Sequence, residues 1–228
     1  ATDINIIKPL VIFITKNGSD NILCLSGQTA CRTLSYLMCN NLTSFFTIFI
    51  RNNLDFHFNS CSKELSFNVI GTTHIVIQGN NKAEMTKITG SIIFIGEKSD
   101  GKFKANIKIK NILLNNCVIT LANLTVIFIN VHFKNTLMGD KLSLLVNIIL
   151  LNITWIQTVK HSAIQEATIE LVSSQYLHIS ITQAILSGVS LHLSCQYFSV
   201  NINNVLISRV IHSNYFLQII EKLQSSLI

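Results

Sequence analysis

A basic cluster is the first group of residues with a defined chemistry, and it comprises Lys98, Lys102, Lys104, Lys108 and Lys110. In an extended chain side chains alternate between two faces, so the even-numbered lysines from 102 to 110 share one face, opposite Ile107 and Ile109. Glu97 and Asp100 are the nearby acids. A local excess of ammonium groups attracts polyanions in a salt-dependent way. Lys102, Lys104, Lys108 and Lys110 are therefore candidate glycan-binding residues; the alternative is a solvated outer strand whose lysines deter edge pairing.

Residues that could cleave a glycan are scattered. Hydrolysis of a glycosidic bond needs two carboxylates close together, and a calcium site needs several oxygen ligands. Glu166 and Glu170 are close in sequence, and Asp140 precedes Lys141, but no acid recurs at a fixed place in the repeat described below. No Gly-x-Ser-x-Gly motif is present. We predict no catalytic residue, no metal ligand and no cofactor.

The aromatic and histidine residues are interpreted structurally. His178 and His192 stand between apolar strand residues and are expected on the surface of strands rather than as ligands or bases. Trp155, the single tryptophan, is expected in or beside the core, with a platform for sugar stacking as the alternative.

The cysteines cluster near the N-terminus, with Cys24, Cys31, Cys39 and Cys61 in the first part of the chain. No pair has the spacing of a zinc ribbon, which disfavours a metal site and leaves disulfides or buried thiols. Four sequons for N-glycosylation are present, at Asn17, Asn41, Asn123 and Asn152. Cysteines and sequons together favour a secreted or cell-surface protein.

The composition indicates a well-packed, charge-poor β protein. Of the 228 residues 49% are hydrophobic and 12% charged, the net charge is +6, and there is one proline. This excludes disordered and collagen-like chains. The uncharged segments Leu142 to Val159 and Leu171 to Ser208 contain too many polar residues for a bilayer helix, so no membrane span is expected. Nucleic acid is not an expected partner, because aromatic residues do not alternate with the basic ones.

A repeat governs the second half of the chain. Two short apolar strands are joined by a polar hinge at Asn111, Asn130, Asn152, Thr182 and Asn203, with intervals of 19, 22, 30 and 21 residues. This period is too short for helical repeats. Asparagine tolerates left-handed backbone angles at sharp corners, and stacked amides can hydrogen-bond along an axis. The pattern predicts a parallel β-solenoid, with a bulge or an offset of one residue at Asn111.

The segment from Cys24 to Met38, with Cys31-Arg-Thr-Leu at its centre, resembles the start of secreted right-handed parallel β-helix proteins of the pectin-lyase-like class. The resemblance implies an all-β, right-handed parallel β-helix with an N-terminal capping helix, for which the apolar spacing over Thr29 to Cys39 is suitable. A second helix is expected over Asn214 to Leu227. The chain is expected to form one domain over residues 1–228, or a part of a longer protein.

The resemblance also implies a cysteine bridge before the capping helix. We expect Cys24 to pair with Cys31 and Cys39 with Cys61, leaving Cys117 and Cys195 as buried thiols.

Many members of this class are polysaccharide lyases or hydrolases. Because the acids are scattered, we expect instead a non-enzymatic extracellular module with a structural, adhesive or glycan-binding role; a lyase or glycoside hydrolase is the alternative. Its expected partner is an anionic polysaccharide or another extracellular protein.

Overall fold

The computed structural model describes residues 10–15, 17–33, 36, 46–50, 64–69, 74–79, 86–96, 106–140, 143–156, 169–171, 174–189, 191–193 and 197–208. The regular structure of this part is all-β apart from the short helix α1 (Ile22–Leu25) and the single helical residue Tyr36. Its strands are β1 (Leu10–Ile14), β2 (Phe46–Ile50), β3 (Glu64–Val69), β4 (His74–Gln78), β5 (Thr86–Gly96), β6 (Asn106–Lys110), β7 (Ile112–Ala122), β8 (Leu124–Ile129), β9 (His132–Lys134), β10 (Leu137–Asp140), β11 (Ser143–Ile156), β12 (Ile169–Leu171), β13 (Ser174–Ser187), β14 (Leu191–Leu193) and β15 (Tyr197–Ser208).

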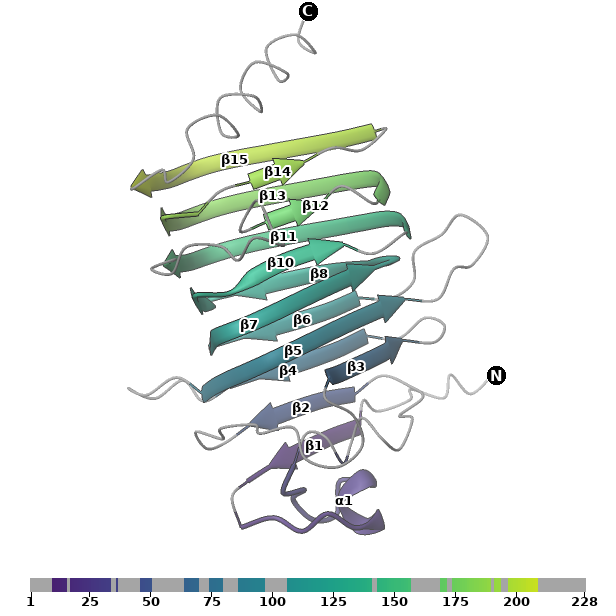
Figure 1. Ribbon diagram of the computed structural model, residues 1–228. Helices are drawn as coiled ribbons and strands as arrows, with labels where there is room; N and C mark the ends of the chain where they lie inside the picture. The colour runs from purple at the N-terminus through teal and green to yellow at the C-terminus, as the bar shows by residue number, and fades with distance from the viewer. Residues whose placement is uncertain are drawn as a thin grey trace, which may run out of the picture.

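All the strand pairs are parallel, and the strands lie one above another along one axis (Figure 1). Their pairing divides the strands into three ladders. Ladder one contains β1, β2, β4, β6, β8 and the first parts of β11, β13 and β15. Ladder two contains the first parts of β5 and β7, then β9 and the last parts of β11, β13 and β15. Ladder three contains β3, the last parts of β5 and β7, then β10, β12 and β14. From β8 onward the chain visits the three ladders in this order, and one such passage is called a coil below.

Side chains alternate between the interior and the outside along each strand. In β8 the burial alternates residue by residue, and Leu124, Val126 and Phe128 are fully buried. The inward residues of all three ladders belong to one hydrophobic cluster. Parallel sheets require apolar cover, and here the ladders cover one another. No helix among the described residues is long and apolar enough to cross a membrane.

Trp155 lies in the core, as the sequence predicts. Its side chain is 0% exposed and stacks on Phe133, with ring centroids 4.2 Å apart. Phe133 in turn meets Phe128 edge to face at 5.1 Å. Trp155 is therefore not a surface platform for a sugar.

Asparagines form the corner between ladders one and two. Asn111, Asn130 and Asn152 have φ angles of 55°, 52° and 53°. Asn130 Nδ2 donates to Asn111 Oδ1 at 3.2 Å, and Asn152 Nδ2 donates to Asn130 Oδ1 at 2.7 Å. Their side chains thus link three consecutive coils, as the sequence predicts.

The expected hinges at Thr182 and Asn203 are wrong by one residue. The left-handed residues are Gln183, with φ 55°, and Asn204, with φ 52°. Register explains the correction, because Thr182 pairs with Leu151 and Asn203 pairs with Thr182, so both are the last paired residues of ladder one, one residue before the corner.

The expected offset at Asn111 is also wrong. Ile107 pairs with Val126 and Ile109 with Phe128 without a shift. The register shift that does occur lies in β5, between Ile88 and Gly90.

The predicted helix over Thr29 to Cys39 is wrong for its first five residues. Cys31 forms a parallel bridge to Ile14, because its N–H donates to Phe13 O at 2.8 Å and its carbonyl accepts from Thr15 N at 2.9 Å. These bonds occupy groups that a helix would need. Tyr36 is helical, and its N–H donates to Thr33 Oγ1 at 3.2 Å, the geometry of a helix cap. The rest of that helix, and the one expected over Asn214 to Leu227, lie outside the described residues.

Candidate functional site

Two of the four candidate lysines are described, and both lie on the outer face of ladder one. In β6 the buried Ile107 and Ile109 alternate with Lys108 and Lys110, which are partly exposed. This is the alternation that the sequence predicts. Lys102 and Lys104 lie outside the described residues.

The strands beside β6 do not neutralise these lysines. The register partners of Lys108 are Val76 and Ile127, and those of Lys110 are Gln78 and Ile129. No strand of ladder one contains Asp or Glu within the described part of the chain. Within the described strands of this ladder, the residues of the types Lys, Arg, Asp and Glu are therefore Lys108 and Lys110.

Basic residues continue round the asparagine corner onto ladder two. His132 and Lys134 of β9 are exposed, and their register partners in β7 are Leu113 and Asn115. Asn115 follows Lys110 by five residues, just beyond the corner at Asn111. Sequence reasoning missed His132 and Lys134, because only the pairing between coils brings β9 beside the strand that follows Lys110.

Acidic residues on the described strands belong to ladder three instead, and they are Glu64, Asp140 and Glu170. Glu170 Oε1 lies 3.8 Å from His192 Nδ1, with both side chains partly exposed. Gly139 is the register partner of Glu170, and Asp140 is one residue further along β10. The sequence pattern did not predict the contact between Glu170 and His192, since the two residues meet only through the pairing of β12 and β14.

The histidines are where the sequence places them. His178 and His192 are partly exposed, and each comes directly after a buried leucine of its strand. His192 differs from the expectation in having a carboxylate close by.

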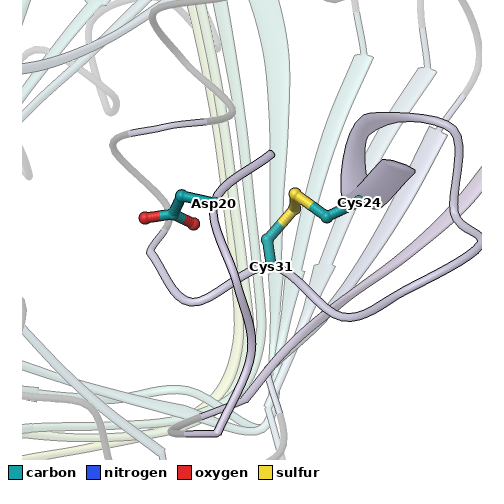
Figure 2. A group of neighbouring side chains, drawn as sticks. All are labelled: Asp20, Cys24 and Cys31. Atoms are coloured by element: carbon teal, nitrogen blue, oxygen red, sulfur yellow. A yellow bond between two sulfur atoms is a disulfide. The ribbon is translucent and has the colours of Figure 1, made fainter. Parts of the chain in front are cut away.

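The N-terminal cysteines form the expected disulfide between Cys24 and Cys31. Figure 2 shows Asp20 beside this bridge, and one ligand atom of each of the three residues lies within 4.8 Å of the others. The sulfurs are bonded to each other, so they are not thiolate ligands. Asp20 accepts hydrogen bonds from the N–H groups of Arg32 and Thr33, both at 2.9 Å, and from Thr33 Oγ1 at 2.7 Å. The group therefore orders the turn after Cys31 rather than binding a metal ion.

Of the remaining cysteines, Cys117 lies in the described part of the chain. Cys117 is a buried free thiol, as expected. Burial raises its pKa from 9.0 to about 12, which keeps the thiol protonated and unreactive at neutral pH. Cys39, Cys61 and Cys195 lie outside the described residues.

Three of the four sequons are described. Asn17 and Asn152 are exposed, whereas Asn123 is half-buried with a φ of 51°. The Asn152 amide already donates to Asn130. Asn41 lies outside the described residues.

Comparisons with protein-family models, with curated proteins and with solved structures find no match to this chain.

Proposed function

We propose that this chain is a right-handed parallel β-helix of the pectin-lyase-like type. The proposal is supported by three parallel ladders visited in a fixed order and by left-handed asparagines that recur at one corner. A solenoid of this kind presents flat outer faces whose rows of side chains repeat at about 4.8 Å along the axis. Such a face suits an extended, repetitive ligand better than a compact one.

The function we propose is that of an extracellular, non-enzymatic module that binds an anionic polysaccharide. One observation carries it: Lys108 and Lys110 project from a ladder that has no acidic residue within its described strands. The disulfide between Cys24 and Cys31 and the exposed sequon at Asn17 support an oxidising, extracellular compartment. Another extracellular protein with an acidic surface is the remaining partner class.

Binding would proceed mainly through charge. Each lysine is a compact point charge with three donors and a flexible stem, so it can follow sulfates or carboxylates along a mobile chain. Lys134 extends the positive potential onto ladder two, while the acids of ladder three lie on another face. The affinity should fall steeply as salt is added.

Heparin-affinity chromatography tests this proposal. The variant with Lys102, Lys104, Lys108 and Lys110 changed to Gln should elute at clearly lower salt than the wild type. Equal elution salt for this variant and the wild type would remove the lysine face as a site.

A second candidate function is glycan cleavage at ladder three. It is favoured by Glu170 and His192, which are register partners on neighbouring strands with Glu170 Oε1 3.8 Å from His192 Nδ1. A carboxylate beside an imidazole can transfer protons to and from a glycosidic bond. New reducing or unsaturated ends produced by the wild type, but not by Glu170→Gln, would support this function over simple binding.

A further inference from the structure

Two tyrosines stack on the outer face of ladder one. Tyr176 of β13 and Tyr197 of β15 are register partners, and their rings lie 5.0 Å apart at an interplanar angle of 12°. Their side chains are 44% and 53% exposed. Large aromatic residues on a flat surface are costly to leave in water and commonly mark a contact site.

Because the two rings stack on each other, each covers one face of the other, and the pair offers its outer ring faces and its ring edges to a ligand. Tyrosine offers a rigid, amphipathic surface at low cost in conformational entropy. The face of an aromatic ring is negative, and the C–H groups on one side of a pyranose ring are slightly positive and apolar, so the two surfaces are complementary. Trp155, which the sequence offered for this role, is buried and cannot take it.

We propose that Tyr176 and Tyr197 form a second subsite for the glycan that the lysine face binds, and that they contact the face of its sugar rings. This inference rests on the proposed function. Both subsites lie on the outer face of ladder one, and the strand residues near the tyrosines carry no acid within the described part. One anionic chain can therefore cross from the lysines to the tyrosines without meeting a carboxylate on this ladder.

Register fixes the separation of the two subsites. Successive register partners lead from Lys108 in β6 through Ile127 and Ile149 to Ser180 in β13. Three strand spacings therefore separate Lys108 from β13. Three strand spacings give about 14 Å along the axis. Tyr176 precedes Ser180 by four residues, or about 13 Å across the ladder. The diagonal is about 19 Å, which is longer than a disaccharide.

The geometry therefore predicts a length threshold. Short oligosaccharides reach the lysines alone, and longer ones reach both subsites. His178 lies on the same face as Tyr176, in the same strand and between the two subsites, and its partly exposed ring can hydrogen-bond to sugar hydroxyls.

The test uses heparin oligosaccharides of two, four, six and eight sugars, with affinity measured by calorimetry at fixed salt. The wild type should gain affinity abruptly once the oligosaccharide is long enough to reach the tyrosines. The variant Tyr176→Thr, Tyr197→Thr should lack this gain and bind the octasaccharide about fivefold more weakly, on the scale of one aromatic contact. Its disaccharide affinity should match that of the wild type.

A matched control comes from ladder two. Ile185 and Leu206 are also exposed register partners, at 48% and 63%. The variant Ile185→Thr, Leu206→Thr should keep the wild-type length dependence, and threonine keeps a good strand propensity in both double variants.

The outcomes separate the two proposals. Wild-type binding of every length by the tyrosine variant would overturn the inference and leave the lysine site in place. Loss of the length step in that variant, together with unchanged binding by the lysine variant, would support the tyrosine subsite and overturn the lysine site. Absence of binding of any oligosaccharide to the wild type would overturn both.

Discussion

Asn130 holds the corner between β8 and β9 through its backbone and through its side chain. Its backbone φ is 52°. Its side-chain Nδ2 donates to Asn111 Oδ1, and its side-chain Oδ1 accepts from Asn152 Nδ2. The substitution Asn130→Ala removes both side-chain hydrogen bonds and leaves an ordinary residue in the left-handed region.

The two losses can be separated. The corner is exposed, so the two hydrogen bonds contribute at the low end of the usual range, about 1 kcal/mol together. Left-handed backbone costs an alanine about 1 kcal/mol more. We expect Asn130→Ala to lower the free energy of unfolding by about 2 kcal/mol. Asn130→Gly loses the same hydrogen bonds but adopts this φ without strain, and its greater freedom when unfolded costs about 0.5 kcal/mol. It should therefore be the more stable of the two variants.

Urea denaturation of both variants measures the difference, provided that the dependence on denaturant stays unchanged. Asn106→Ala is the control, because Asn106 lies within β6 on the outer face of the same ladder; it should change stability by less than about 0.5 kcal/mol. At ordinary strand positions alanine is more stable than glycine. If Asn130→Ala were more stable than Asn130→Gly, the assignment of backbone strain to this corner would be refuted.

Two further predictions concern the core. Trp155→Ala should lower the free energy of unfolding by about 3–5 kcal/mol, because a fully buried ring stacked on Phe133 is lost; thermal unfolding measures this, and Ile156→Ala, at a 41% exposed neighbour, should have a small effect. The pKa of the Cys117 thiol is raised from 9.0 to about 12, so between these pH values the folded chain keeps a proton that the unfolded chain has lost. The free energy of unfolding should therefore fall with rising pH in this window, by up to about 1.4 kcal/mol per pH unit for this group. The denaturation midpoint of Cys117→Ala should decline less steeply with pH than that of the wild type. An equally steep decline in both proteins would contradict the buried thiol as its cause.

The alternation of apolar and polar residues predicted the strands and the interior well. It located the corners at Asn111, Asn130 and Asn152, where one asparagine stands between apolar strands. It failed at Gln183 and Asn204, because each follows another polar residue and the pattern cannot tell which takes the left-handed backbone. Inward residues give a sharper signal: they are two apart within a strand and three apart across a corner, as at Ile181 and Ala184.

The first five residues of the expected N-terminal helix were predicted wrongly for a different reason. An amphipathic spacing says which face of a helix would be buried, but it says nothing of a neighbouring strand that competes for the backbone. At Cys31 the competitor is β1, which takes both the N–H and the carbonyl group.

The candidate site residues also differ in whether sequence spacing alone could place them together. Lys108 and Lys110 lie in one strand, so their shared face follows from sequence spacing. Tyr176 and Tyr197, and likewise Glu170 and His192, meet only through the register between coils. Coil lengths vary with the insertions between strands, and a sequence pattern does not supply that register.

The parallel ladders also bear on the order in which the protein can form during synthesis. Each strand added to ladder one lies on a strand made about one coil earlier; Thr125 of β8, for example, receives Asn147 of β11. A chain emerging from the ribosome can thus extend an existing surface instead of waiting for its last residues. The bridge between Cys24 and Cys31 joins residues only 7 apart in the sequence, so oxidation can close it before the later coils are made. Nascent chains released at successive lengths should accordingly acquire protease resistance in steps of one coil, from the N-terminus onward.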